Sequence, residues 1–273
     1  MSTIPQRRTK ADANTSQMRP ARKRRSAKAS FAYGYRDVPK RLPNGQYRCV
    51  RIPLTLDDVL HPREGDVHLL GDPHTEDCYY LRGSLKVRYA HDRSVVVLSD
   101  CGIYWDVPRL RHHSPDLAVI FGVKRRKDWS TFHVKVEKVR PVLIIEVTSP
   151  DTRVNDVKTK VEEYARAKVP HYVIADAQEK KGEKRRLSFK CYRLVGKAYE
   201  VVPLDERGRA WLEPLGLWLG VRVDAETGGD RVALIDPATN ETLGDHVAEA
   251  QARAAAEARI RELEATVRRR KRR

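Results

Sequence analysis

Two carboxylates stand at the ends of apolar segments, where a charge needs a physical reason. Asp116 follows Pro115 directly before the apolar residues 117–120, and Glu146 ends an apolar run that begins at Val142. An unpaired buried carboxylate is costly, so such groups are usually paired or bound to a cation. On neighbouring strands, the two would suit Mg²⁺, which binds one or two carboxylates together with waters and a substrate phosphate. Two structural alternatives stay open: Asp116 as a turn residue at a strand edge, and Glu146 as a satisfied structural acid.

A lysine follows these acids on a predicted helix. Residues 155–167 carry apolar side chains at about every fourth position, and Pro170 marks the end of this helix. Lys160 lies four residues after Asp156, so the two side chains share one helix face. Lys160 could reach back over the strand ends toward the acids. The alternative is a surface ion pair, worth roughly a few tenths of a kcal/mol.

Hydrophobic periodicity indicates the elements that would position these residues. It favours an α/β fold with a mixed central sheet flanked by helices. Residues 31–51 lack such periodicity, and we expect an irregular segment there with a turn at Asn44-Gly45. The expected helices are 55–60, begun by a capping box from Thr55 to Asp58, then 74–89 and 155–167. The expected strands are 95–98, 102–105, 115–121, 142–147, 171–176, a hairpin of 187–194 and 198–202, and edge strands at 211–223 and 232–236.

Three motifs in this region follow one another in a specific order. They are SPDLAVI at 114–120, VLIIEVTSPDTRVNDVKTK at 142–160, and YARAKVPHY at 164–172, with Asp176 after them. Together they resemble the Uma-type family of restriction endonuclease-like proteins, which belongs to the PD-(D/E)XK nuclease superfamily. The resemblance covers roughly residues 53–223. It implies a restriction endonuclease-like fold and an endonuclease that hydrolyses phosphodiester bonds, in DNA, with Mg²⁺ or Mn²⁺.

The resemblance also implies a role for each matched residue. Asp116 and Glu146 would hold the metal, assisted by the backbone carbonyl of Val147. Lys160 would orient the attacking water or neutralise charge on the phosphate. One departure is important, because the superfamily's usual lysine lies two residues after the Glu, and this chain has Thr148 there. Lys160 on the helix is the substitute that we expect.

Several further residues are weaker candidates. His74, at the start of the helix expected over 74–89, resembles a histidine that the family often has there, although it could equally serve packing. The basic loop Lys124, Arg125, Arg126 and Lys127 could contact phosphates or simply be solvated. His112 and His113 are adjacent on an extended segment, so they point to opposite faces and are not expected to share a metal. The four cysteines include no CxxC pair and are expected to be buried thiols.

The net charge of +17 is concentrated at the two ends of the chain. Residues 1–30 hold nine Lys/Arg and one acidic residue and are expected to be a disordered tail, and residues 245–273 are expected to be a charged helix with weak coiled-coil potential. A single nuclease domain is expected over 31–240. No apolar run is long enough for a membrane helix, and no secretory signal is recognisable. The scattered cysteines are typical of a reduced cytoplasmic protein, and the expected partners are nucleic acid and a second copy of the chain in a homodimer. The alternative function is a catalytically inactive nuclease-fold protein that binds DNA as an accessory module.

Overall fold

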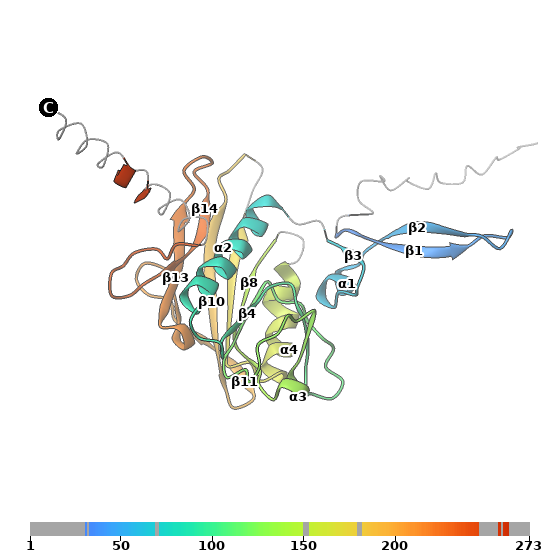
Figure 1. Cartoon of the computed structure of the whole chain (residues 1–273), viewed down its shortest axis with the longest axis horizontal. Coiled ribbons are helices and arrows are strands. Elements are labelled where there is room, and N and C mark those ends of the chain that lie inside the picture. The colour runs from blue at the N-terminus through green and yellow to red at the C-terminus, as the bar shows by residue number, and fades with distance from the viewer. Residues whose placement is uncertain are drawn as a thin grey trace, which may run out of the picture.

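A six-stranded mixed sheet lies at the centre of the computed structural model (Figure 1). The structure describes residues 31, 33–68, 71–149, 153–178, 182–245, 256–257 and 259–261. Across the sheet the strands are β11 (Ala198–Val202), β10 (Arg186–Val195), β9 (His171–Gln178), β8 (Pro141–Val147), β6 (Leu117–Ile120) and β4 (Val96–Leu98). Only β8 and β9 pair in parallel, and every other pair in this sheet is antiparallel. The expected mixed α/β core is therefore present.

Helices cover both faces of this sheet, as the alternation of apolar residues requires. Helix α2 (Asp72–Arg88) packs on the face that contains Leu117 and Val119, and α4 (Lys160–Arg166) packs on the face that contains Ala118 and Ile120. Consecutive strand residues thus enter two different cores, because side chains alternate across a strand. A strand buried on both faces is apolar throughout, which is why β6 and β8 have no polar residue before their ends.

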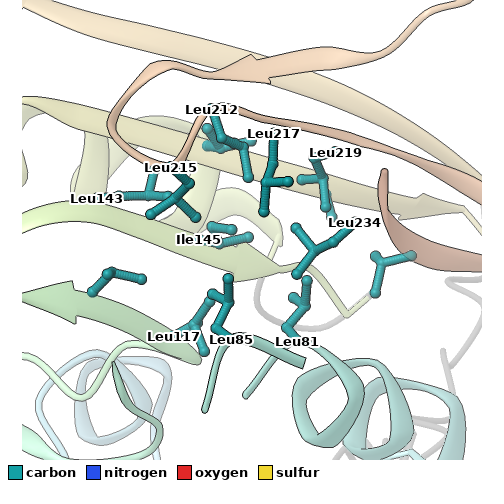
Figure 2. Close-up of a cluster of buried hydrophobic side chains, with 14 of the residues drawn as sticks. Leu81, Leu85, Leu117, Leu143, Ile145, Leu212, Leu215, Leu217, Leu219 and Leu234 are labelled. Atoms are coloured by element: carbon teal, nitrogen blue, oxygen red, sulfur yellow. The ribbon is translucent and has the colours of Figure 1, made fainter. Parts of the chain in front are cut away.

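A second, three-stranded sheet completes the core on the α2 side. It consists of β12 (Ala210–Leu212), β13 (Leu217–Val223) and β14 (Asp230–Ile235), and a short 3-10 turn covers Glu213–Leu215. Figure 2 shows leucines of this sheet opposite those of α2, β6 and β8. The labelled side chains are Leu81, Leu85, Leu117, Leu143, Ile145, Leu212, Leu215, Leu217, Leu219 and Leu234. The sequence predicted 211–223 and 232–236 as edge strands; β14 is an edge strand, and it belongs to this second sheet, in which β13 is the central strand.

The expected strand over 211–223 is also interrupted. Pro214 lies in the 3-10 turn, and Gly216 ends the turn with a φ of 62°. Proline cannot donate to a strand ladder, and a positive φ favours glycine, so the chain turns back on itself here instead of extending. Most other predicted elements are confirmed within a few residues, including α1 (Leu56–Leu60) with its Thr55–Asp58 capping box.

The segment expected to be irregular is a β-ribbon. Strands β1 (Tyr35–Arg41) and β2 (Tyr47–Pro53) form an antiparallel hairpin, which projects from the body beside α1 (Figure 1). The short strand β3 (Asp66–Val67) pairs with the base of β1. The prediction failed because both faces of the hairpin are largely exposed, so its strands lack the alternation of apolar and polar residues that reports a half-buried strand. Only the Asn44-Gly45 turn was visible in the sequence.

Two smaller features complete the body. Strand β5 (Gly102–Tyr104) pairs in parallel with β7 (Thr131–His133), and α3 (Val134–Glu137) follows β7 directly. Before α4, residues Asn155–Thr159 form a π-helical turn, which the predicted continuous helix did not include. Of the four cysteines, Cys49 on β2 is exposed, so the expectation of four buried thiols is wrong at that position.

The charged tails lie largely outside the described residues. Residues 1–30 are not described, and of the expected C-terminal helix only 256–257 and 259–261 are described beyond Asp245, all of them helical and exposed. Within the described part of the chain, no helix has the length and apolar character needed to cross a membrane. The homodimer, the cytoplasmic location and the domain limits stay predictions.

Candidate active site

Asp116 and Glu146 meet at one end of the central sheet. Strands β6 and β8 are antiparallel neighbours with Leu117 opposite Ile145, so the start of one strand lies beside the end of the other. The backbone N–H of Asp116 donates to Glu146 Oε2 at 3.3 Å, and the backbone N–H of Val147 donates to Asp116 Oδ2 at 2.8 Å. Each acid is thus held by the backbone of the other strand, which fixes the two carboxylates side by side.

Lys160 contacts this acid pair from α4. Its Nζ lies 3.0 Å from Glu146 Oε1 and 2.8 Å from Asp156 Oδ1, and its side chain is only 13% exposed. The pair with Asp156 has the predicted i, i+4 spacing, but it is buried, so the surface ion pair considered from the sequence is wrong. A buried lysine between two carboxylates is a fixed charge in the site, unlike a surface pair whose side chains exchange with water.

Burial and neighbouring charges shift the pKa values of these groups in opposite directions. Burial raises the pKa of Glu146, and the charge of Lys160 offsets this only in part. Burial also acts on Asp116, but the charge of His74 and its hydrogen bond outweigh it and hold the pKa of Asp116 below its usual range. Burial lowers the pKa of Lys160, yet Asp156 and Glu146 more than compensate, so its pKa is raised and the ammonium is retained. The site therefore has one firmly ionised acid and one that resists ionisation.

His74, from the first turns of α2, is the second cation in contact with the acids. Its Nε2 lies 3.2 Å from Asp116 Oδ2, and this carboxylate raises the pKa of His74 to about 9 against the opposing effect of burial. The sequence prediction that His74 accompanies the site is consistent with this position. A protonated imidazole has no free lone pair for a metal, so in this state His74 is a hydrogen-bond donor and a counter-charge to Asp116.

His74, Cys78 and Asp116 also place one potential ligand atom each within 4.8 Å of one another. Cys78 lies one helical turn after His74, with its Sγ 3.8 Å from His74 Nδ1. Burial raises the pKa of this thiol far above its usual value, and the thiolate is the form that binds metals. We therefore interpret Cys78 as a packing residue beneath His74.

A cleft of about 640 Å³ opens onto these groups. The five predicted site residues with functional side chains, His74, Asp116, Glu146, Asp156 and Lys160, all line it, as does Val147. The rest of its wall comes from α1 and the segment after it, together with residues around β5 and β7. The sheet end thus supplies the charges, and the peripheral elements enclose the space above them.

Thr148 occupies the position of the superfamily's lysine and has a structural role. It is buried, its hydroxyl donates to Asp176 Oδ1 at 3.2 Å, and the N–H of Ala177 donates to its Oγ1 at 2.9 Å. Asp176 in turn accepts two hydrogen bonds of 2.7 Å from Arg153. These contacts join β8 to β9 and to the segment before α4, so Thr148 helps position the helix that carries Lys160.

Sequence reasoning missed two residues of the site. Tyr164, buried on α4, donates its hydroxyl hydrogen to Glu146 Oε1 at 2.7 Å. It lies four residues after Lys160, and this spacing was the available signal, because i and i+4 residues share a helix face. Asp100 lies on the cleft wall with a left-handed φ of 51°, and burial together with the charge of Asp116 raises the pKa of its carboxyl. Nothing in its local sequence distinguishes Asp100 from an ordinary turn residue.

The other candidates lie elsewhere. The basic loop 124–127 follows the far end of β6 and contributes no residue to the cleft wall; its Lys127 pairs with Glu137. His112 lines the cleft and its Nε2 bonds to the carbonyl of Pro62, whereas His113 is buried and bonds to Trp105 and Glu163. The two adjacent rings therefore have separate partners, as their opposite orientation on an extended segment predicts.

Comparison with known proteins assigns the family. The model of the Uma2 family, described as "Putative restriction endonuclease", matches residues 64–226, which is more than half of the chain. The chain belongs to the Uma2 family. A solved structure of a protein from Anabaena variabilis ATCC 29413, described as "a putative nuclease belonging to DUF820", is similar to the chain with 16% sequence identity and a TM-score of 0.38. That similarity covers 57% of this chain and 86% of the other. The search of curated proteins gave no match.

The Uma2 match contains all the cleft residues on β6, β8 and α4 and leaves the hairpin β1–β2 outside. Membership indicates a nuclease and a nucleic-acid substrate. The donor set of the cleft fits a hard divalent cation, because carboxylate oxygens from two strands converge on a space open to water. Lys160 and His74, which also line the cleft, compensate part of the same negative charge.

Proposed function

We propose that this Uma2 protein is a metal-dependent endonuclease that hydrolyses phosphodiester bonds in DNA at the cleft. One observation carries the proposal: two carboxylates on adjacent strands are fixed by reciprocal backbone hydrogen bonds, with a buried lysine 3.0 Å from one of them. Apolar residues of similar volume would often be at least as stable at such positions, so the acid pair favours a chemical role over a purely structural one. The family membership supports the same class of reaction.

In this proposal, Asp116, Glu146 and the carbonyl of Val147 hold Mg²⁺ or Mn²⁺. The bound cation would polarise the scissile phosphate and lower the pKa of a water molecule. Lys160 stays protonated and donates to the attacking water or to the phosphate, where negative charge develops. Tyr164 positions Glu146 through its 2.7 Å hydrogen bond, and His74 positions Asp116.

The test is cleavage of supercoiled plasmid with added Mg²⁺ or Mn²⁺. The wild type should nick or linearise the plasmid, and EDTA should abolish cutting. Asp116→Asn and Glu146→Gln should each lose at least about 10³-fold in rate, which corresponds to roughly 4 kcal/mol of transition-state stabilisation. Both variants keep the volume of the side chain, so retained folding, measured by thermal unfolding, separates a lost reaction from a lost structure. Cutting that survives both substitutions would refute the assignment.

The accessory-module alternative has one observation in its favour, because Thr148 stands where the superfamily has its lysine. It predicts a wild type that binds DNA and never cuts it with either metal. The placement of Lys160 favours the nuclease, since a cation already lies against the acid pair.

A further inference from the structure

The hairpin of β1 and β2, residues 35–53, has an unusual charge distribution. We call it the β1–β2 arm. It carries five basic residues and one acidic residue, and the acid, Asp37, pairs with Arg51 across the ribbon. At the tip, Lys40 lies directly opposite Arg48 in the strand register, and Arg41 lies opposite Tyr47. All four tip residues are exposed, and Tyr47 is 70% exposed.

The tip is destabilising for the isolated protein. Like charges directly opposite each other on an antiparallel pair repel, and no acidic residue among those described forms an ion pair with Lys40, Arg41 or Arg48. Lysine on an edge strand prevents pairing with other chains, but that purpose needs no second like charge directly opposite it. A tip with only positive charge instead indicates an anionic partner that relieves the repulsion.

The base of the arm is held firmly, in contrast to its tip. Arg36 donates to Asp66 at 2.7 Å and to Asp58 at 3.0 Å, which ties β1 to β3 and α1. Gly34, with a φ of 108°, lies so close to β3 that a Cβ there would meet the carbonyl oxygen of Val67 at 1.9 Å. A two-stranded ribbon is at best marginal by itself, so these contacts set the direction of the arm.

The arm begins at the cleft. The segment that joins it to α2 supplies Val59, Arg63, Asp66 and His68 to the cleft wall, and the arm projects outward from there (Figure 1). Seven residues per strand give a reach of about 23 Å. A nucleic acid held by the tip would therefore run past the entrance to the acid pair.

From these observations we infer that the β1–β2 arm is a second DNA contact, which inserts into the major groove of duplex DNA and holds the duplex across the cleft. The major groove of B-form DNA, about 12 Å wide, admits a two-stranded ribbon, whereas the deep and narrow major groove of A-form RNA does not. Lys40, Arg41 and Arg48 contact phosphates on the groove walls, and Tyr47 enters between them. The inference rests on the proposed function for its substrate, but it concerns binding and not catalysis.

Cys49 provides a direct test without any substitution. It is the one exposed cysteine of the four and lies beside Arg48 in the arm. Alkylation of Cys49 by iodoacetamide, followed by mass spectrometry in EDTA to prevent cleavage, should slow at least about 5-fold with a saturating 30-base-pair DNA duplex. The buried Cys78, Cys101 and Cys191 serve as internal controls for unfolding. Unchanged alkylation, or equal protection by heparin or double-stranded RNA, would overturn the groove assignment. Protection that grows with protein concentration without DNA would assign the arm to a second copy of the chain instead.

A charge variant gives an independent measurement. Lys40→Gln/Arg41→Gln/Arg48→Gln should bind the duplex at least about 10-fold more weakly at 100 mM salt, and its log K against log salt slope should be shallower by about 2–3, near 0.9 for each lost phosphate contact. The matched control removes three exposed charges near the opposite end of the six-stranded sheet, Arg166→Gln/Lys168→Gln/Lys197→Gln, and should leave the slope unchanged. An equal loss in both triple variants would overturn the inference.

The two proposals fail separately. A wild type that cuts plasmid without protecting Cys49 removes the arm contact and leaves the nuclease. Protection of Cys49 with no cutting under any metal keeps the arm and removes the nuclease function.

Discussion

The cleft and the β1–β2 arm both concentrate charged side chains, but those of the cleft are buried and paired with opposite charges, whereas those of the arm tip are exposed and of one sign. In the cleft, Lys160 is 13% exposed and lies between Glu146 and Asp156, and His74 is bonded to Asp116. At the arm tip, Lys40 and Arg48 face each other in solvent with the same sign. Buried opposite charges hold each other in place, whereas exposed like charges attract a polyanion over a range set by salt.

The difference separates two tasks that the net charge of +17 would merge. Chemistry at a phosphodiester needs groups that are already oriented, because reorientation during the reaction costs rate. Capture of DNA needs only a positive electrostatic field and a protein surface whose shape fits the groove. The predictions below test whether the two regions are as independent as their charge environments indicate.

The largest effect is expected at Lys160. Lys160→Met leaves Glu146 and Asp156 buried without their cation, and we expect a loss of about 3–5 kcal/mol in unfolding free energy, measured by chemical denaturation. Lys160→Met/Asp156→Asn removes one of the two carboxylates that lose their cation, so it should recover a large part of the lost unfolding free energy. Cutting should stay at least about 100-fold below wild type in the double variant if Lys160 acts on water or phosphate. Wild-type cutting by the double variant would reduce Lys160 to a neutralising charge.

A smaller effect, on pH dependence, is expected at His113. This buried ring accepts a hydrogen bond from Trp105 and bonds to Glu163, and burial lowers its pKa to about 4, below the value near 6.5 of the unfolded chain. Below pH 6.5 the unfolded state therefore binds a proton that the folded state does not. The stability that the neutral His113 ring contributes is thus lost as the pH decreases from 6.5 toward 4. The stability advantage of wild type over His113→Gln should shrink by about 1.6 kcal/mol between pH 6.5 and 5.

The neighbouring His112→Gln is the matched control, since its ring is half-exposed on the cleft wall. A constant difference between wild type and His113→Gln across this range would show that His113 does not titrate in the way its burial requires.

The smallest effect is expected at the base of the arm. Arg36→Met breaks the part-buried pairs with Asp58 and Asp66. Both carboxylates keep a hydrogen bond from a backbone N–H group, so we expect a loss of only about 1 kcal/mol, confined to the arm. Amide hydrogens of Tyr35–Arg41 should exchange roughly 5-fold faster, while those of β8 stay unchanged. Arg51→Met, which loses the exposed pair with Asp37 and the contact of its guanidinium with the Tyr35 ring, is the control and should have a smaller effect. Faster exchange in β8 would show that the arm and the core unfold together.

Burial decided how much of the fold could be predicted from the sequence. Strands β6 and β8 are covered on both faces, so their apolar runs were visible, and the acids that interrupt those runs were visible with them. The arm has solvent on both faces, so its strands left no hydrophobic pattern. The strands β12, β13 and β14 were expected only as edge strands, because a sequence reports that a strand is half-buried but not which sheet it joins.

Local sequence decided which residues of the candidate site could be predicted. Asp116, Glu146 and Lys160 could be identified because each is unusual in its local sequence or matches a motif. Tyr164 begins one of the matched motifs, but it was given no role in the site because an aromatic residue is normal on the core face of a helix. Asp100 was hidden because Ser99-Asp100 is typical of any turn, and only the fold of β4 and β5 brings it to the cleft.

The π-helical turn at Asn155–Thr159 has a consequence for how this site can change. The turn contains one more residue than an α-helical turn between the Arg153 anchor and α4. Lys160 and Tyr164 both reach Glu146 Oε1 from the helix that follows, at 3.0 and 2.7 Å. A single-residue deletion within 155–159 would restore a regular helix but rotate both side chains by about 100° away from the acid. The extra residue thus sets the rotation of the helix face that contacts Glu146, and we expect a change in chain length here to disturb the site more than most side-chain substitutions would.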